Sequence, residues 1–323
     1  MTKPVFHRDL RKARFLPRTA PIGPRALGVL RKLSTLTMDR PPSNGLIARV
    51  NADVSVRVFR SSWARHPAPA LLWIHGGGYV LGSASQDDRG CRHLAHRLGI
   101  VVASVEYRLA PEHPFPTPLE DCHAALLWLA AQPDVDPARV AIGGASAGGG
   151  LAAALTLLAK ERATEPGAVS PVFQLLAYPM LDDRTAARTD IDQSGMRMWN
   201  QTSNRIGWRA YLGEAADHNV PPLAAPARYK DLSGLPPAWI GVGSNDLFHD
   251  EDIAYAERLR EAGVATTLHV VPGAYHGFDR MEPKAGVSRA FLEAQSTALR
   301  DAGIAGDAPP EPADDRRTER PAA

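Results

Sequence analysis

Gly144-Ala145-Ser146-Ala147-Gly148 sets a serine between two glycines at the spacing of a sharp turn. Side chains two positions before and after the serine would collide with neighbouring backbone in such a turn, which explains the glycines at 144 and 148. The turn lifts the hydroxyl clear of the sheet, beside the free N–H groups that begin a helix. The G-x-S-x-G pattern between a strand and a helix therefore predicts that Ser146 is a nucleophile.

Two downstream residues have the types and the chain order that would activate this serine. His276 lies in a loop after the last apolar run, in HVVPGAYHGF, and Asp246 follows the preceding run, AWIGVGS. A histidine takes the serine proton, and a carboxylate fixes the tautomer of that histidine. The order Ser146, Asp246, His276 is that of the α/β-hydrolase fold. Asp250 competes with Asp246, but it lies where a helix is expected to begin, which favours an N-cap.

An upstream glycine run has the composition of an oxyanion hole. His75-Gly76-Gly77-Gly78 directly follows the apolar run ALLWI. Without side chains, the backbone N–H groups of Gly76, Gly77 and Gly78 can approach a substrate oxygen, as in the HGGG loop of esterases, and Ala147 after the serine adds another donor. We expect His75 to support its loop by bonding backbone rather than substrate.

The same glycines also match a weak phosphate-binding pattern. Gly148-Gly149-Gly150-Leu151-Ala152-Ala153 fits G-x-G-x-x-A after a strand. A dinucleotide site would need an acid about 20 residues further on, at the end of the next strand. That strand is expected to end at Tyr178-Pro179, well beyond this distance, and no GxxxxGK[ST] motif is present. No two histidines combine with acids at metal-ligand spacing. We therefore expect neither a cofactor nor a metal ion.

The apolar pattern from about residue 54 predicts the elements that must position these groups. Short apolar runs are expected to form strands at 54–59, 70–76, 100–108, 139–144, 172–179, 238–244 and 266–273. The first alternates like a half-buried edge strand, and the others are continuous, as in a parallel sheet covered on both faces. Helices are expected at about 86–98, 119–131, 147–163, 250–262 and 283–301. This alternation predicts an α/β fold with a doubly wound, mostly parallel sheet.

The interval between Asp183 and Ala238 breaks the alternation of strands and helices. It contains the aromatic-rich stretch MRMWNQTSNRIGWRAYLG. A structureless loop of that length is unusual in a compact domain. We expect a helical cap inserted at about 184–225, joined by an N-terminal cap segment at 1–50, on a catalytic domain spanning 51–305. The alternative is that these aromatic side chains pack on the sheet.

Several other residues are expected to be structural. Thr117 to Glu120 predict a capping box with proline at the first helical position. The histidines at 93, 96 and 123 lie on predicted helices and are expected to be surface or packing residues. We expect ion pairs for Arg108 and Glu112, and turn positions for Asp182 and Asp183.

Composition places the chain among globular proteins. It has 323 residues, 44% of them hydrophobic, and a formal net charge of +2, which argues against a nucleic-acid partner. No apolar run reaches the roughly 18–20 residues of a membrane span, and the start does not resemble a signal peptide. Cys91 and Cys122 suggest buried thiols in a reducing compartment. We therefore expect a cytoplasmic protein without stable membrane insertion.

The two ends differ from the rest of the chain. Residues 1–40 hold ten Lys or Arg and two acids, and this arm is expected to form an amphipathic helix packed on its own domain rather than a membrane contact. The stretch 306–323 is proline-rich and charged, which predicts a disordered tail. The sequence leaves open whether the protein forms a homodimer.

The chain resembles the hormone-sensitive-lipase-like family of microbial carboxylesterases and lipases. The resemblance runs from about Leu71 to Phe278 and rests on HGGGYVLGS, VVASVEYRLAPEHPFP, GGASAGGGLAAAL, LLAYPMLDD, DLFHDEDIAYAERLREAGV and YHGF. It implies an α/β-hydrolase fold with a helical cap, and hydrolysis of a small-molecule ester of short to medium acyl length, without a cofactor. This chain departs from the family in having Ala145 where Asp or Thr is usual, and Leu247 where Pro is common.

Two alternative functions remain on the same fold. A peptidase or amidase would usually need a larger gating domain than this chain has room for. A non-catalytic ligand-binding relative would lack the histidine that is present here as His276.

Overall fold

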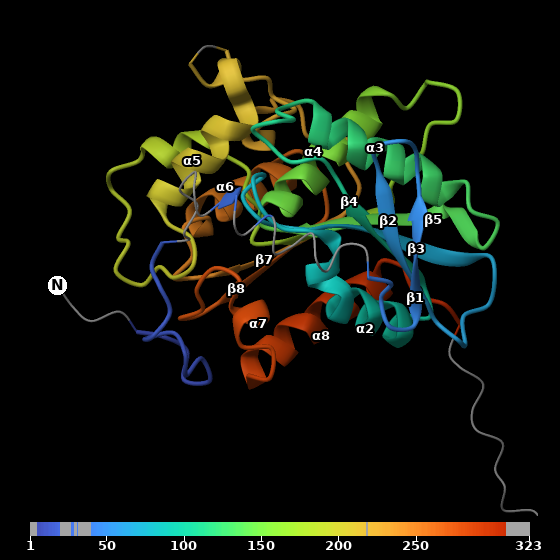
Figure 1. Ribbon diagram of the computed structural model, residues 1–323, viewed down its shortest axis with the longest axis horizontal. Helices are drawn as coiled ribbons and strands as arrows, with labels where there is room; N and C mark the ends of the chain where they lie inside the picture. The colour runs from blue at the N-terminus through green and yellow to red at the C-terminus, as the bar shows by residue number, and fades with distance from the viewer. Residues whose placement is uncertain (1–4, 20–26, 29–30, 32–39, 218, 308–323) are drawn as a thin grey trace, which may run out of the picture.

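In the computed structural model, the described residues are 5–19, 27–28, 31, 40–217 and 219–307. The basic arm was predicted to be an amphipathic helix, but its described residues 5–19 form turns and bends, so the prediction was wrong there: this stretch bonds the loop at Gly273 and the insertion. Residues 20–26, 29–30 and 32–39 of the arm, and the tail from residue 308, lie outside the described residues. The described residues fold around one eight-stranded sheet with helices on both faces (Figure 1). The prediction of an α/β fold with a mostly parallel, doubly wound sheet is therefore confirmed.

The sheet has the strand order β1-β2-β4-β3-β5-β6-β7-β8. Its strands are β1 Gly45–Arg49, β2 Ser55–Arg60, β3 Ala68–Ile74, β4 Val101–Glu106, β5 Val135–Ala145, β6 Phe173–Ala177, β7 Ala238–Gly243 and β8 Thr266–Val271. Strands β3 to β8 are parallel, and β2 is antiparallel to β1 and β4. Because parallel strands end at one edge, this edge gathers the loops that carry Ser146, Asp246 and His276.

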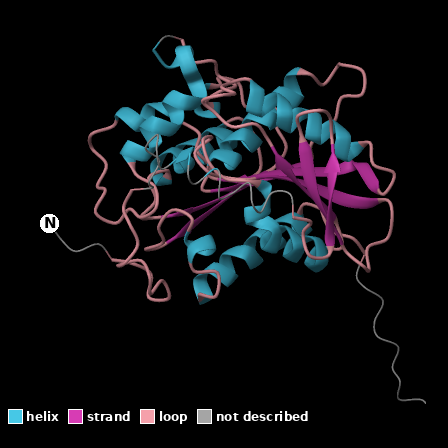
Figure 2. Cartoon of the chain, viewed as in Figure 1, coloured by secondary structure: helices cyan, strands magenta, loops and turns pink. Residues whose placement is uncertain are grey.

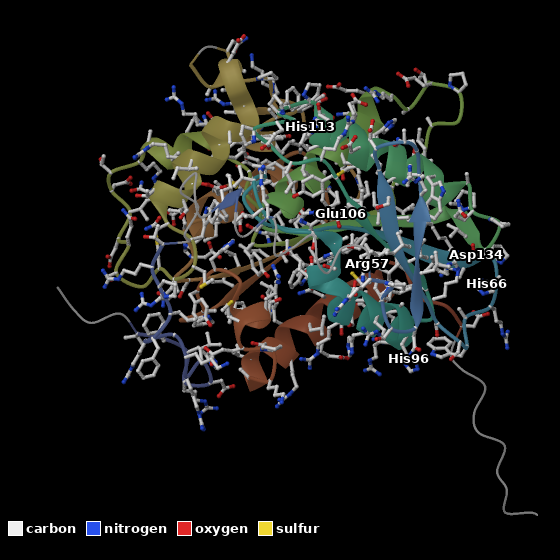
Figure 3. All side chains as sticks on the ribbon, viewed as in Figure 1. Arg57, His66, His96, Glu106, His113 and Asp134 are labelled. Carbon is white, nitrogen blue, oxygen red and sulfur yellow. The ribbon has the colours of Figure 1, made fainter. Side chains whose placement is uncertain are left out.

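The predicted edge strand at 54–59 is an interior strand, so that prediction was wrong. No strand was predicted before residue 54, whereas β1 pairs with the outer side of β2. Its alternation has another cause: Arg57 is buried on β2 because Asp88 accepts two hydrogen bonds of 2.7 Å from its guanidinium (Figure 3). The polar residue in the alternating apolar pattern is therefore a buried partner in an ion pair, and does not indicate a solvent-facing side of an edge strand.

The five helices expected between about residues 86 and 301 are present. They are α2 Asp88–Leu98, α3 Thr117–Ala130, α4 Ala147–Glu161, α6 His249–Glu261 and α8 Gly286–Asp301, with the further helices α5 Gln201–Leu212 and α7 Phe278–Met281. Helices α2, α7 and α8 cover one face of the sheet, and α3, α4 and α6 cover the other (Figures 1 and 2). Each face therefore buries its own apolar core against the same sheet.

The start of α3 differs from the predicted capping box. The helix begins at Thr117, and Pro116 occupies the N-cap position without a side-chain cap. The Glu120 carboxylate accepts hydrogen bonds of 2.9 and 2.6 Å from Arg162 on α4 instead of reaching back to the helix start. A charge-assisted bidentate pair between two helices outcompetes the local cap.

The inserted segment packs beside the sheet edge and contacts the described part of the N-terminal segment. Arg197 donates a 2.6 Å hydrogen bond to the Ala13 carbonyl, and Met198 N–H donates to Pro17 at 2.9 Å. The described N-terminal segment also reaches the loop after β8, since His7 N–H donates to the Gly273 carbonyl at 3.0 Å. The two expected cap segments thus lie against each other, while the domain boundaries themselves stay a prediction.

Two further sequence features have a structural counterpart. Cys91 and Cys122 are free and buried, as predicted. Within the described ranges, every helix is too short or too polar to cross a bilayer.

Candidate active site

Ser146 occupies a strained turn between β5 and α4. Its backbone has φ 60° and ψ −125°, a left-handed conformation that costs a non-glycine residue about 1–3 kcal/mol. A Cβ atom at Gly144 would lie 2.3 Å from the Gly148 carbonyl oxygen, and one at Gly148 would lie 2.1 Å from the Ile74 carbonyl oxygen. Ser146 N–H donates to the Ala177 carbonyl at 2.9 Å. The two glycines therefore allow the turn, and neighbouring strands hold it.

The structure brings Ser146, His276 and Asp246 into one chain of hydrogen bonds. Ser146 Oγ lies 2.9 Å from His276 Nε2, and His276 Nδ1 lies 2.8 Å from Asp246 Oδ2. The other Asp246 oxygen accepts a 3.0 Å hydrogen bond from Phe248 N–H. All three residues are 5–7% exposed. Residues separated by 130 and 30 positions thus meet with the geometry of a nucleophile, a base and an orienting acid.

Aromatic rings enclose the His276 imidazole. The rings of Tyr178 and Phe248 present edge-to-face contacts at centroid distances of 5.0 and 5.2 Å, and Trp199 lies at 6.3 Å. Packing on several sides restricts rotation of the imidazole, so Nε2 stays directed at Ser146. None of these three rings was a predicted site residue. Trp199 belongs to the aromatic-rich stretch of the insertion, which was the only sequence signal for it.

The glycine loop after β3 lies beside the serine turn. A Cβ atom at Gly76 would be 2.7 Å from the Ala145 carbonyl oxygen, and Gly77 and Gly78 have φ of 134° and 61°. A Cβ atom at Gly78 would lie 2.1 Å from the Trp199 ring. The loop turns through hydrogen bonds from Val80 and Leu81 N–H to the Gly77 carbonyl. Only glycine fits this close approach to the serine turn and to the insertion.

His75 is buried beneath the glycine loop. Its Nδ1 lies 2.9 Å from the Gly76 carbonyl oxygen, and its ring stacks on Tyr107 with a centroid distance of 4.3 Å. Burial lowers the pKa of His75 to about 4, so the ring is neutral at pH 7. The Gly76 carbonyl also accepts a 3.0 Å hydrogen bond from Gln86. The loop is therefore anchored from below by neutral groups.

Asp250 is not an N-cap, so that interpretation was wrong. Helix α6 begins at His249 with Phe248 at the N-cap position, and no side chain caps it. Asp250 lies in the first turn, 2.9 Å from His249 Nδ1, and forms a 3.0 Å ion pair with Arg188 of the insertion. Because the Asp250 carboxylate binds Arg188, it is not available to cap the N-terminus of α6. Asp246, rather than Asp250, lies within hydrogen-bond distance of His276 Nδ1.

The other residues predicted to be structural form ion pairs or hydrogen bonds outside the candidate site. Arg108 is paired with Asp121 at 2.6 Å, and Glu112 with Arg31 at 2.6 Å, as expected. Asp182 accepts from Arg184 N–H at the start of a short 3₁₀ helix. Across the described part of the chain, no three His, Cys, Asp or Glu side chains are grouped to hold a metal ion.

Two buried acids on α6 stand directly behind the Asp246 loop. Glu251 accepts hydrogen bonds of 2.8 and 3.1 Å from Leu181 and Asp182 N–H, which ties the start of the insertion to α6. Burial raises the pKa of Glu251 to about 8 from its usual 4.5. Asp252 is fully buried, and burial raises the pKa of its carboxyl well above the usual value. A protonated Glu251 is therefore expected at neutral pH.

Glu251→Gln should weaken the pH dependence of stability between pH 6.5 and 8. In this range the unfolded chain has released the Glu251 proton and the folded chain has kept much of it, so stability falls as pH rises, by up to about 1.4 kcal/mol per pH unit. Glutamine cannot ionise, yet its oxygen can still accept from Leu181 and Asp182. We expect urea unfolding midpoints of the variant to decline less steeply over this range than those of the wild type.

A matched control uses the same helix. Glu257 is exposed on α6, so Glu257→Gln should leave the wild-type slope unchanged. Parallel slopes for Glu251→Gln and the wild type would contradict a raised Glu251 pKa.

Residues 71–280 match the family model for the alpha/beta hydrolase fold. This range covers the glycine loop, the serine turn and both loops that carry Asp246 and His276. The chain belongs to this family. Esterase LipI of Mycobacterium tuberculosis is 37% identical over 72% of this chain and 71% of its own length, and carboxylesterase NlhH of the same species is 37% identical over 70% and 71%. The resemblance to microbial carboxylesterases is therefore confirmed.

Solved structures of this alpha/beta hydrolase family agree with the fold. A bacterial heroin esterase superposes with a TM-score of 0.81 at 37% identity, covering 94% of this chain and 99% of its own. The esterase LipW from Mycobacterium marinum superposes with a TM-score of 0.80 at 32% identity, covering 94% and 98%. The likeness thus extends beyond the matched family range to nearly the whole described chain.

Proposed function

We propose that this protein is a serine carboxylesterase that hydrolyses small-molecule esters of short to medium acyl length. The enzyme class is carboxylic ester hydrolase, in agreement with the esterases to which the chain is similar. The observation that carries the mechanism is the hydrogen-bonded chain from Ser146 Oγ through His276 to Asp246. That arrangement suits acyl transfer through a covalent intermediate.

In the first half of the reaction, His276 Nε2 takes the Ser146 hydroxyl proton as Oγ attacks the ester carbonyl. The protonated imidazole then gives this proton to the departing alcohol, which leaves an acyl-enzyme on Ser146. In the second half, His276 deprotonates a water that attacks the acyl carbonyl, and Ser146 regains its proton as the acid departs. Asp246 holds Nδ1–H throughout and stabilises the transient imidazolium.

Backbone N–H groups stabilise the oxyanion of the tetrahedral intermediates in this proposal. The donors are those of Gly76, Gly77 and Gly78 in the loop and of Ala147 at the first position of α4. Each donor of this kind contributes about 3–4 kcal/mol to transition-state stabilisation in related holes. His75, Gly144 and Gly148 have supporting roles, because they fix the loop and the turn that present the donors. The proposed reaction uses no cofactor.

Trp199 supports the preference for shorter acyl chains. Its ring lies against Gly78 on one side and 6.3 Å from the His276 ring on the other. It is 5% exposed, so it forms part of the wall over Ser146 rather than a surface flap. A rigid indole at this place limits the room beside the reacting carbonyl.

Trp199→Ala should shift the acyl preference toward longer chains. Removing the indole opens space between the glycine loop and His276, so kcat/KM for the p-nitrophenyl decanoate ester should rise relative to the butyrate ester, by about tenfold if two or so buried methylenes are gained. Trp208→Ala, in the same insertion but packed on Tyr79 rather than on His276, is the control for lost stability. An unchanged ratio of the two esters in Trp199→Ala would contradict the assignment.

A panel of p-nitrophenyl esters from acetate to palmitate, together with the p-nitroanilide of the preferred acyl group, tests the proposed function. We expect the highest kcat/KM between C2 and C8 and at least a hundredfold lower value for the anilide. Faster turnover of the anilide would favour an amidase. The absence of turnover with every member of the panel would favour a non-catalytic binding protein of this fold.

A further inference from the structure

A cavity of about 760 Å³ lies between α2 and α8, outside the site already described. These helices lie side by side on one face of the sheet, where Arg97 and Glu293 join them by a 2.8 Å ion pair (Figure 1). The lining includes neither Ser146 nor His276. Its volume is in the range of small-molecule binding sites, which run from about 300 to 1,000 Å³.

The interior of the cavity combines an apolar wall with an unpartnered polar group. Trp73, Leu94 and Ala145 contribute buried apolar surface, each 7% exposed or less. Ser288 on α8 is 3% exposed, and its Oγ has no hydrogen-bond partner within the described part of the chain. Gln295 lies two turns further along the same helix and is also buried at the wall. A buried hydroxyl without a partner costs about 1–3 kcal/mol unless something bonds to it.

The acids of the lining are already engaged within the protein. Asp87 forms a 3.4 Å ion pair with Arg280 and accepts a 3.0 Å hydrogen bond from the Trp73 indole. Asp279 accepts a 2.7 Å hydrogen bond from the Tyr178 hydroxyl. Glu293 is paired with Arg97 across the two helices. Asp87 and Glu293 are thus paired with arginines, and one Asp279 oxygen is occupied by the Tyr178 hydroxyl.

The rim carries positive charge. Arg89 on α2 and Arg289 on α8 are exposed and line the cavity from opposite helices. Arg289 donates a hydrogen bond to the Lys284 carbonyl and forms no ion pair with any described residue. Two arginines facing one opening favour an anion, and a guanidinium matches a carboxylate in shape.

The cavity wall touches the candidate active site at three points. Ala145 directly precedes Ser146 in the turn. Tyr178 bonds Asp279 with its hydroxyl and packs its ring edge-to-face with His276. Gln86, also in the lining, donates to the Gly76 carbonyl of the glycine loop. A molecule in the cavity would therefore contact Ala145, Tyr178 and Gln86, which position the serine, the histidine and the glycine loop.

We propose that this cavity binds an amphipathic monocarboxylate, with its carboxylate at Arg89 and Arg289, its apolar body against Trp73 and Leu94, and a hydroxyl or carbonyl at Ser288. The site is separate from the ester site and modulates it through Tyr178 and Gln86. The binding step does not require the proposed esterase function, whereas the modulation rests on it.

Calorimetric titration of Ser146→Ala protein with 4-hydroxyphenylacetate tests the site without any turnover. The probe carries a carboxylate, a flat apolar ring and a terminal hydroxyl. We expect saturable binding at one site with a Kd of about 1 mM or below. Arg289→Glu should weaken this binding about tenfold, and the same charge reversal at Arg300, exposed at the end of α8 and outside this cavity, should not. Equal weakening by both variants, or no saturable binding, would overturn the proposal.

Filling the cavity provides a second test. Leu94→Trp should abolish probe binding; if that protein does not fold, Ser288→Leu places apolar volume at the unpartnered hydroxyl with the same expected loss. Retained binding in a folded filled variant would show that the probe lies elsewhere and overturn the proposal.

A kinetic measurement on the wild-type enzyme separates the two sites. We expect the probe to change kcat for a p-nitrophenyl ester with little change in KM, and Arg289→Glu to need about tenfold more probe for the same change. Purely competitive inhibition would place the probe at Ser146 and overturn the separate site.

Discussion

Ser146→Ala protein is expected to lose ester hydrolysis while keeping its fold. The substitution removes the only atom that can form the acyl-enzyme, and loss of a triad serine has cost about 10⁶-fold in kcat in a serine protease. Stability should change little, because alanine fits the turn and removes one hydrogen bond, from Oγ to His276. The measurements are kcat for a p-nitrophenyl butyrate ester and the melting temperature.

Covalent labelling provides the companion measurement. An organophosphate should label Ser146 of the wild-type protein and no other residue, and mass spectrometry of peptides locates the adduct. The matched control is Ser296→Ala, which removes another buried serine hydroxyl and should leave both labelling and turnover intact. Labelling at a different residue, or wild-type turnover in Ser146→Ala, would exclude Ser146 as the nucleophile.

Asp246→Asn should lower kcat by about 10⁴-fold at a near-normal melting temperature. Asparagine can keep the hydrogen bond from Phe248 N–H, but its amide group turns a donor toward His276 Nδ1, which now lies 2.8 Å from a carboxylate oxygen. The imidazole then takes the tautomer that carries its proton on Nε2 and cannot accept from Ser146. The same change in a serine protease triad had an effect of this size.

Asp250→Asn is the matched control, four residues along the same loop and helix. Its carboxylate is 55% exposed and binds Arg188 and His249, so the variant should lose less than about 1 kcal/mol and stay active. Exchanged phenotypes for the two variants would mean that the orienting acid is Asp250.

The alternation of apolar runs and helical patterns was sufficient to predict the fold class. Continuous apolar runs such as ALLWI reported burial on both faces, and that signal depends only on local composition. Strand order and the interior place of β2 depend on contacts between distant segments. The buried Arg57–Asp88 pair shows the difficulty, because the arginine looks solvent-facing until its partner on α2 is known.

The residues of the candidate site also divide into those that the sequence could predict and those that depend on contacts between distant segments. Ser146, the glycine loop, Asp246 and His276 were predictable because backbone geometry and chain order restrict the residue types there. Trp199 and Tyr178 were not, because a large aromatic residue has the same sequence pattern in a core as beside the His276 imidazole. The cap predicted for Asp250 was wrong because its position at a helix start gave no sign of Arg188, which only the fold brings within ion-pair distance.

The contacts of the first described residues have a consequence for how the protein is made. Asn245, next to Asp246, donates to the Val5 carbonyl, Gly273 in the loop before His276 accepts from His7, and the segment before Trp199 bonds Ala13 and Pro17. A ribosome adds about 5–20 residues per second, so the beginning of the chain waits on the order of ten seconds or more for these partners to emerge. Residues 5–17 thus reach their native contacts long after their own synthesis, and the nascent enzyme closes its active site only after the strands that flank it have been completed.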